Sequence, residues 1–530
     1  MRVQLCGVMA AVLAIGGATM GMVAQTPVEI RVDARAATTP FPHFWEQTFG
    51  SGRAILSLRA EYRDDLKTVK QATNFQSVRF HGIFMDEVGL YDPNRKSTNP
   101  GQTAQEVKTK GIYNFSYVDQ IYDGLLANGV KPFVELSFMP KRLASDPNAL
   151  HAFWYKQNVS PPKDYAQWDA MIQAFAQHLV DRYGIEEVST WKFEVWNEPN
   201  IDFWAGKPKQ PTYFELYDHT ARDLKTVSER IQVGGPATAQ AGWVPAFLAH
   251  CKEQGVPVDF VTTHVYGNDK GSDVFGPDSK EASEQIPRNE MVCRAVRHVH
   301  EQIAASPYPK MPLIMSEYNA SYANEPDVTD TTYIGPWLAE TISQCDGLTE
   351  AMSYWDFSDV FEEQGVTRTP FYGGFGLIAS DEIPKPALHA FAMLHKLGER
   401  RIALDSDSAL ATRRADGTVV LALWNYAAPY GEGATYTPPP AVIPPAKSFT
   451  VKVDGVRADA RVTVWRLDAD HGNVLKAYDA MGRPADPSRE QIAALRAAGE
   501  SSAPEQASLR NGSFSVRIPA QGLVVVSVAK

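Results

Sequence analysis

The strongest constraint on this fold is a regular alternation of short apolar segments with longer helical patterns between residues 42 and 399. Each apolar segment has the length and composition of a buried strand. Eight such segments occur: Phe44–Phe49, Ser77–Phe80, Pro132–Phe138, Trp191–Trp196, Ile231–Gly235, Phe260–Tyr266, Leu313–Glu317 and Ala351–Phe357. Helical patterns lie between them, for example at Tyr165–Tyr183, Tyr213–Arg230, Glu290–Ile303 and Tyr333–Gln344. The alternation predicts an α/β fold, a (β/α)8 TIM barrel over residues 42–399.

A doubly wound open sheet would give a similar alternation of strands and helices. Such folds bind dinucleotides through a glycine-rich phosphate loop that follows the first strand. No complete loop of that kind follows Phe44–Phe49, which favours the barrel.

Beyond residue 400 the helical patterns give way to short strand-like segments separated by turn residues. These segments are Ala409–Thr412, Val419–Trp424, Phe449–Val453, Val462–Trp465, Ser513–Ile518 and Leu523–Val528. The pattern predicts a β-sandwich over residues 400–530. Within it, Pro429–Lys447 has the proline and glycine content of a long loop, and Arg489–Ala498 forms a short helical insert.

The N-terminus carries the pattern of a secretory signal peptide. Arg2 precedes a largely apolar run from Val8 to Ala24, and cleavage is expected near Ala24–Gln25. A membrane anchor is the alternative, but the run is short and rich in glycine, and no later segment approaches the length of a spanning helix. We therefore expect residues 1–24 to be removed and the protein to be exported, either to the periplasm or out of the cell.

Charge and cysteine content exclude several classes of protein. The formal net charge of −11 argues against nucleic acids and anionic membranes as partners. Of the four cysteines, Cys6 lies in the signal peptide. The other three, Cys251, Cys293 and Cys345, lack metal-ligand spacing and allow at most one disulfide. We expect buried free thiols.

Two glutamates stand at the ends of predicted strands. Trp191–Trp196 is followed by an Asn-Glu-Pro turn that contains Glu198, and Leu313–Glu317 ends in Glu317. By the strand count, Glu198 follows the fourth strand and Glu317 closes the seventh. Catalytic residues of barrel enzymes lie at these C-terminal ends, so both carboxyl groups are expected at one site. Such a pair can cleave a glycosidic bond, with one group as acid and the other as nucleophile or base. The alternative is two unrelated structural glutamates.

Six segments around these glutamates form a specific set: Arg79–Gly82, Glu194–Asn200, Thr263–Tyr266, Ser316–Asn319, Ser353–Glu363 and Phe371–Ile378. The set resembles glycoside hydrolase family 39, the β-xylosidases and α-L-iduronidases among the retaining barrel glycosidases. The resemblance runs from about residue 28 to the C-terminus. It implies that Glu198 is the acid/base and Glu317 the nucleophile. It also implies that residues 25–41, which contain the strand-like Val28–Asp33, join the C-terminal sandwich.

Eight further residues are candidates for substrate binding: His81, Phe138, Asn197, His264, Tyr266, Trp355, Glu362 and Glu363. Asn197 is suited to bind the 2-hydroxyl of the reacting sugar, or else to cap the turn before Pro199. His264 and Tyr266 alternate on one strand and so face the same side. There, Tyr266 can hydrogen-bond Glu317 and help to keep it ionised.

The other candidates each have a structural alternative. His81 binds a sugar hydroxyl or is a core histidine with satisfied hydrogen bonds. Trp355 offers an apolar platform under the sugar ring, although any buried barrel tryptophan would look the same. Glu362 and Glu363 bind hydroxyls of the terminal sugar or form a solvated acidic pair. Phe138 is a candidate for the pocket wall.

The resulting prediction is a retaining, exo-acting β-D-xylosidase that removes xylose from the non-reducing ends of xylo-oligosaccharides without a metal or organic cofactor. An α-L-iduronidase is the first alternative. Its substrate carries a carboxylate and needs a basic residue, for which Arg368 is the candidate. A non-catalytic sugar-binding protein and an endo-acting glycanase on the same barrel are the others. The oligomeric state stays open.

Overall fold

The computed structural model describes residues 26–93, 112–430 and 442–530. The expected signal peptide, residues 1–24, lies outside these ranges, and so does most of the expected loop Pro429–Lys447. Within the described ranges, no helix is both long enough and apolar enough to cross a membrane.

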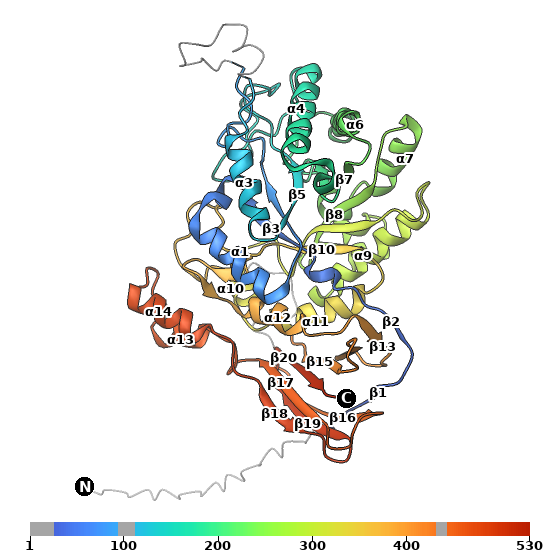
Figure 1. The fold of residues 1–530 in the computed structure, drawn as a ribbon, viewed down its shortest axis with the longest axis vertical. Coiled ribbons are helices and arrows are strands. Elements are labelled where there is room, and N and C mark those ends of the chain that lie inside the picture. The colour runs from blue at the N-terminus through green and yellow to red at the C-terminus, as the bar shows by residue number, and fades with distance from the viewer. Residues whose placement is uncertain (1–25, 94–111, 431–441) are drawn as a thin grey trace, which may run out of the picture.

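Eight parallel strands close into a barrel in the order β10-β3-β4-β5-β6-β7-β8-β9 (Figure 1). They are β3 (Thr48–Arg53), β4 (Ser77–His81), β5 (Lys131–Leu136), β6 (Lys192–Val195), β7 (Gln232–Thr238), β8 (Phe260–Tyr266), β9 (Leu313–Asn319) and β10 (Ala351–Tyr354). The predicted TIM barrel is confirmed. Seven of these strands overlap the predicted apolar segments closely, and the first is displaced.

The prediction of a strand at Phe44–Phe49 is wrong for most of its length. Phe44–Glu46 forms a 3-10 helix, η1, whose three side chains are buried, and β3 begins after it. β3 has a weak apolar signal because it contains two glycines. Gly50 is required there, since a Cβ atom on it would lie 2.3 Å from Cε3 of Trp355.

Helices cover the barrel with their apolar faces turned inward. The main ones are α1 (Ala60–Thr73), α3 (Ser116–Leu126), α4 (Tyr165–Tyr183), α6 (Lys209–Val227), α7 (Val244–Gln254), α9 (Arg288–Ala304), α11 (Ile334–Cys345) and α12 (Pro386–Leu394). In α4 the buried residues Trp168, Ile172, Phe175 and Leu179 recur at helical spacing, and the Asp164 side chain caps its first turn. Shorter pieces are η2 (Ala54–Leu58), α5 (Ile185–Val188), η3 (Ala239–Ala241), α8 (Gly271–Phe275), η4 (Lys280–Ser283) and α10 (Pro326–Thr329).

The C-terminal region forms two sheets that face each other, as predicted for a β-sandwich. One sheet has seven strands in the order β18-β17-β20-β15-β14-β13-β2, and the other has the order β1-β16-β19. The strands are β1 (Val28–Asp33), β2 (Thr38–Pro40), β13 (Arg400–Ile402), β14 (Ala409–Arg413), β15 (Val419–Asn425), β16 (Lys447–Asp454), β17 (Arg461–Leu467), β18 (Glu505–Ser508), β19 (Ser513–Ile518) and β20 (Gly522–Val528). β1 runs parallel to β16, so an N-terminal strand does pair with the sandwich.

The central strand β15 of the seven-stranded sheet is buried on both faces. On β15, Leu421 and Leu423 belong to the core between the two sheets. The alternate residues Val420, Ala422 and Trp424 belong to the large core of the barrel. In Figure 1 this sheet lies beside α11 and α12, two helices of the ring that surrounds the barrel, and its strands β15, β17 and β20 contact them. The sandwich therefore packs against the outer helices on one side of the barrel.

A small helical subdomain extends from the sandwich. It contains α13 (Leu475–Ala480) and α14 (Arg489–Ala498), and α14 matches the predicted helical insert. Ser488 and Gln491 form a capping box at the start of α14. The two helices pack near a two-stranded sheet made of β11 (Ile378–Ala379) and β12 (Ile383–Pro384).

The expectation of free thiols is wrong for two of the three cysteines. Cys293 on α9 and Cys345 on α11 form a disulfide, whereas Cys251 is free and buried. The partners are 52 residues apart in the sequence, and only the packing of α9 beside α11 brings their Cα atoms to 5.3 Å. Spacing alone could not reveal that contact.

Candidate active site

Glu198 and Glu317 lie at the C-terminal end of the barrel. Glu198 follows β6, the fourth barrel strand, and Glu317 lies on β9, the seventh, as the strand count predicted. The backbone at Glu198 turns sharply, with φ +45°, and its N–H donates to the carbonyl of Ala237 at 2.7 Å. This turn, together with Pro199, ends the strand and fixes the start of the Glu198 side chain.

The two carboxyl groups meet at His264. Nδ1 of His264 lies 2.9 Å from Oε1 of Glu198 and 3.6 Å from Oε2 of Glu317. One oxygen from each glutamate and one nitrogen of His264 all lie within 4.8 Å of one another. In retaining glycosidases the carboxyl groups are about 5–5.5 Å apart, and in inverting ones about 6.5–9.5 Å. The upper limit of 4.8 Å on the distance between these two oxygens is compatible with the retaining arrangement.

Glu317 is held by two strong donors. Nη1 of Arg79 donates to Oε1 at 2.7 Å, and the hydroxyl of Tyr266 donates to Oε2 at 2.6 Å. The contact between Tyr266 and Glu317 was predicted from their places on neighbouring strands. Burial and the charge of Glu317 raise the pKa of Tyr266, so the phenol keeps its proton for this bond. Both oxygens of Glu317 thus accept charge-stabilising hydrogen bonds.

Glu198 has a different environment. No guanidinium or tyrosine donates to it in the described part of the chain, and its carboxyl group is buried. Burial raises the pKa of Glu198 to about 7, although the nearby positive charges of His81 and Arg79 oppose the rise. A carboxyl group that holds its proton near neutral pH can act as a general acid.

Arg79 is the centre of a buried ion network beneath this pair. Its guanidinium contacts Glu194 at 2.5 Å, Glu135 at 2.9 Å and Oδ1 of Asn197 at 2.8 Å, besides Glu317. Burial alone would lower the pKa of Arg79, but the surrounding carboxylates raise it above its usual value. In the barrel register Glu135 stands directly opposite Glu194 on neighbouring strands.

Our sequence reasoning assigned no role to Arg79, Glu135 or Glu194. A signal was present, because charged residues of opposite sign occur inside three consecutive apolar strands. Such residues are almost never fully buried unless they are paired. That rule predicts a buried ion cluster, although it does not say which strand partners meet.

The uncharged ring of His264 connects Glu198 with Ser316 through hydrogen bonds. Burial lowers its pKa to about 4, so the ring is uncharged near neutral pH. Nε2 lies 3.1 Å from the hydroxyl of Ser316. With its proton on Nδ1, His264 donates to Glu198 and accepts from Ser316, which satisfies both ring nitrogens.

His81 and its neighbours form one side of the site. Nδ1 of His81 lies 2.7 Å from Glu135, while Nε2 lies 4.0 Å from both Glu317 and Glu363. Trp355 and Phe138 flank the ring, with centroid distances of 4.7 and 5.9 Å. Burial, followed by the charges of Glu317 and Glu198, raises the pKa of Glu363 well above its usual value. These residues are therefore brought together around His81.

Asn197 and Glu362 have clearer structural partners. The amide oxygen of Asn197 accepts from Arg79, and its NH2 group has no hydrogen-bond partner among the described residues, so it is available to a ligand. The Glu362 carboxylate is bound by Arg53 at 2.7 Å and Arg59 at 2.5 Å. Burial opposes its charge, but these two guanidinium groups hold the pKa of Glu362 below its usual value. It contacts none of the other candidates in the described ranges.

Two groups of described side chains have ligand types and spacing that suit a metal ion. One is Glu198, His264 and Glu317, and the other is His43, Glu46 and His395 at the opposite end of the barrel. In the first group both oxygens of Glu317 are already taken by Arg79 and Tyr266. The protein thus supplies the counter-charge for Glu317 itself.

We expect the Arg79→Met substitution to destabilise the protein strongly, because it leaves buried carboxylates without a counter-charge. The expected loss of unfolding free energy is about 3–5 kcal/mol, measured by urea denaturation at pH 7. Arg63→Met is the matched control, since the acceptors of Arg63 in the described part of the chain are the carbonyl groups of Ser57 and Gln120. It should lose about 1 kcal/mol or less. Equal losses in the two variants would contradict the ion network.

The chain matches a family of known enzymes along most of its length. The family model "Glycosyl hydrolases family 39" covers residues 28–513. A β-xylosidase of Geobacillus stearothermophilus is 39% identical over 461 residues, which make up 86% of either chain. The crystal structure of a monomeric β-xylosidase from Caulobacter crescentus CB15 superposes with a TM-score of 0.81 at 34% identity, over 95% of this chain and 99% of that one. An α-L-iduronidase of Mus musculus is 27% identical over 268 residues, 46% of this chain and 38% of the other. This chain belongs to glycosyl hydrolases family 39.

Proposed function

We propose that this chain is a retaining, exo-acting β-D-xylosidase that hydrolyses terminal xylose from xylo-oligosaccharides. The observation that carries the proposal is the asymmetric pair of glutamates. Their nearest oxygens lie within 4.8 Å, and only one of the two is held by strong donors. The β-xylosidase of Geobacillus stearothermophilus, 39% identical over most of its length, supports the choice of sugar.

The different surroundings of Glu317 and Glu198 give each residue its catalytic role. Glu317, which accepts from Arg79 and Tyr266, attacks the anomeric carbon while the bond to the leaving oxygen breaks. Glu198, which has its pKa raised by burial, gives its proton to that oxygen. The product of this step is a xylosyl ester of Glu317. Glu198 then takes a proton from water, and the water oxygen attacks the same carbon and releases Glu317.

Charge around the site favours a neutral sugar over a uronic acid. The guanidinium groups nearest to the candidate residues, Arg79, Arg53 and Arg59, are already paired with carboxylates. Arg368, the residue considered for a uronide, is exposed and has no ion pair in the described ranges. Glu363 adds an acidic group 4.0 Å from His81. Among the described residues of the site, therefore, no unpaired guanidinium remains to bind a substrate carboxylate.

The same proposal places the enzyme outside the cytoplasm, in the periplasm or the medium. The signal-like pattern of residues 1–24 supports export. The Cys293–Cys345 disulfide supports it independently, because disulfides persist in oxidising compartments.

The pH dependence of kcat/KM should show an alkaline limb that belongs to Glu198. Because burial raises its pKa to about 7, the acid is protonated below this pH and loses its proton above it. Activity should therefore fall by about tenfold per pH unit above pH 7. Kinetics with an aryl β-D-xyloside between pH 4 and 10 will measure this limb.

Two variants identify the group responsible for the limb. In Glu198→Ala, hydrolysis of 2,4-dinitrophenyl β-D-xyloside, whose leaving group needs no acid, should show no fall near pH 7. Glu363→Gln is the matched control, because Glu363 also has a raised pKa and should not set the limb. A limb that survives in Glu198→Ala but disappears in Glu363→Gln would reverse the assignment.

Azide should distinguish the nucleophile from the acid/base. In Glu317→Ala, azide takes the place of the missing nucleophile and should yield the α-xylosyl azide, with inverted configuration. In Glu198→Ala, azide attacks the glycosyl-enzyme and should yield the β-xylosyl azide, with retained configuration. NMR of the isolated azides reads out both results. Activity of wild-type size in Glu317→Ala without azide would remove Glu317 from the mechanism.

The substrate claim is tested by hydrolysis of aryl β-D-xyloside beside aryl α-L-iduronide. We expect turnover of the xyloside only, with β-xylose as the first anomer seen by NMR. Xylotriose should release xylose and xylobiose, as an exo-acting enzyme requires. Absence of xyloside turnover would refute the sugar assignment, and α-xylose as the first product would refute the retaining mechanism.

A further inference from the structure

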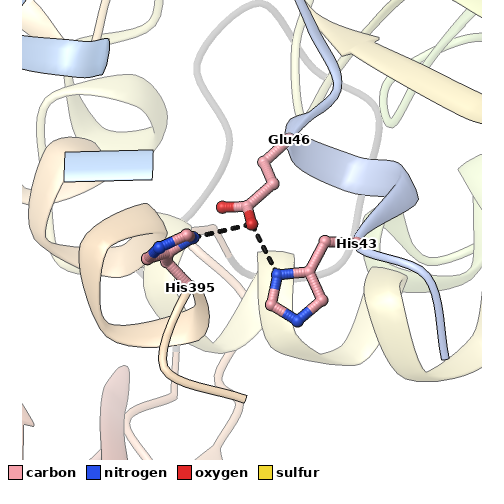
Figure 2. A group of neighbouring side chains, drawn as sticks. All are labelled: His43, Glu46 and His395. Atoms are coloured by element: carbon pink, nitrogen blue, oxygen red, sulfur yellow. Dashed lines mark hydrogen bonds and ion pairs between the residues drawn. The ribbon is translucent and has the colours of Figure 1, made fainter. Parts of the chain in front are cut away.

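Three side chains converge at the N-terminal end of the barrel, away from the proposed catalytic pair. His43 is the N-cap and Glu46 the last residue of the helix η1 that leads into β3, and His395 is the C-cap of α12, the last barrel helix. Nδ1 of His43 lies 2.5 Å and Nδ1 of His395 lies 2.8 Å from the same oxygen, Oε1 of Glu46. Figure 2 shows both rings directing a nitrogen at that one carboxylate.

Glu46 is a buried carboxylate without a fixed counter-charge. Its side chain is 4% exposed, and within the described ranges its ion-pair partners are the two histidines, with no lysine or arginine among them. Its second oxygen, Oε2, is buried and has no hydrogen-bond partner in the described structure. Burying a charge in this way is costly unless a cation accompanies it.

We propose that His43, Glu46 and His395 bind one divalent transition-metal ion such as Zn²⁺. Two imidazole nitrogens and a carboxylate oxygen are a ligand set that zinc accepts. The ion would supply the positive charge that Glu46 lacks. His395 is 38% exposed, so the ion has a path from solvent and a fourth position for water.

The spacing of the ligands fits this reading with a small adjustment. In a tetrahedral zinc site the metal–ligand bonds are about 2.0–2.2 Å, which puts neighbouring ligand atoms about 3.3 Å apart. The present nitrogen–oxygen contacts of 2.5 and 2.8 Å would have to open by less than an ångström. The partly exposed ring of His395 can move away from Glu46, and a small rotation of the Glu46 side chain would open its contact with His43.

The cluster lies where the chain enters and leaves the barrel, so its role would be in the stability of the fold. Glu46 and His395 are 349 residues apart, and they join the segment that enters the barrel to the segment that leaves it. A bound ion would cross-link the first and the last chain segment of the barrel. The link would lie next to β13, where the chain passes into the sandwich. It would raise stability by binding only the folded state and would take no part in the hydrolytic reaction.

The test uses full-length protein without a histidine tag, stripped of metal with EDTA and dialysed. Titration with ZnCl2 in a calorimeter should show one tight site, and Zn²⁺ should raise the melting temperature. Co²⁺ should give the visible absorption of a tetrahedral site. Glu46→Gln and His395→Gln should each weaken Zn²⁺ binding by at least about tenfold and remove the thermal shift.

Two controls make the result specific. His300→Gln removes an exposed histidine whose hydrogen-bond partner among the described residues is the carbonyl of Leu348, and it should bind Zn²⁺ as the wild type does. Glu317→Gln breaks the other metal-capable group and should also keep the site. His395→Gln lies outside the hydrolytic site, so unchanged xyloside turnover shows that it folds. The proposal is overturned if the wild type binds no Zn²⁺, if both cluster variants still bind it, or if Glu317→Gln abolishes binding.

Discussion

The active site of this chain depends on the buried guanidinium of Arg79. A fully buried charge is stable only when its partners surround it, and here three barrel strands and the turn after one of them supply the partners. Glu135, Glu194 and Glu317 provide carboxylates, and Asn197 provides an amide oxygen. Through these contacts a single side chain fixes the proposed nucleophile and the residue next to the proposed acid. The geometry of the site is thus set by the layer of side chains beneath it.

Two identical side chains acquire opposite chemistry from this arrangement. Glu317 accepts hydrogen bonds from Arg79 and Tyr266, which stabilise its anion. Glu198 is buried beside the neutral ring of His264 and has its pKa raised to about 7. When the glycosyl-enzyme forms, the charge on Glu317 disappears, and ionisation of Glu198 becomes easier. Glu198 can therefore serve as the acid in the first step and as the base in the second.

Most of the architecture could be predicted because the spacing of apolar residues along the sequence reflects which residues are buried. Seven barrel strands, the order of the helices and the places of Glu198 and Glu317 follow from apolar runs and their count. The first strand could not, since its glycines make room for Trp355 and leave no apolar signal. The Cys293–Cys345 bond and the partners of Arg79 could not either, because they depend on which elements become neighbours in space.

Glu362 illustrates the limit of motif reasoning for function. It stands beside Glu363 in a segment that resembles the family, and the sequence gives no reason to treat the two differently. In the fold, Glu363 approaches His81, while Glu362 is bound by Arg53 and Arg59. A carboxylate that already accepts from two guanidinium groups has little capacity left for a sugar hydroxyl. Its effect on substrate would come through the loop that it anchors, so the contacts of a residue, rather than its place in a motif, decide which acid faces the ligand.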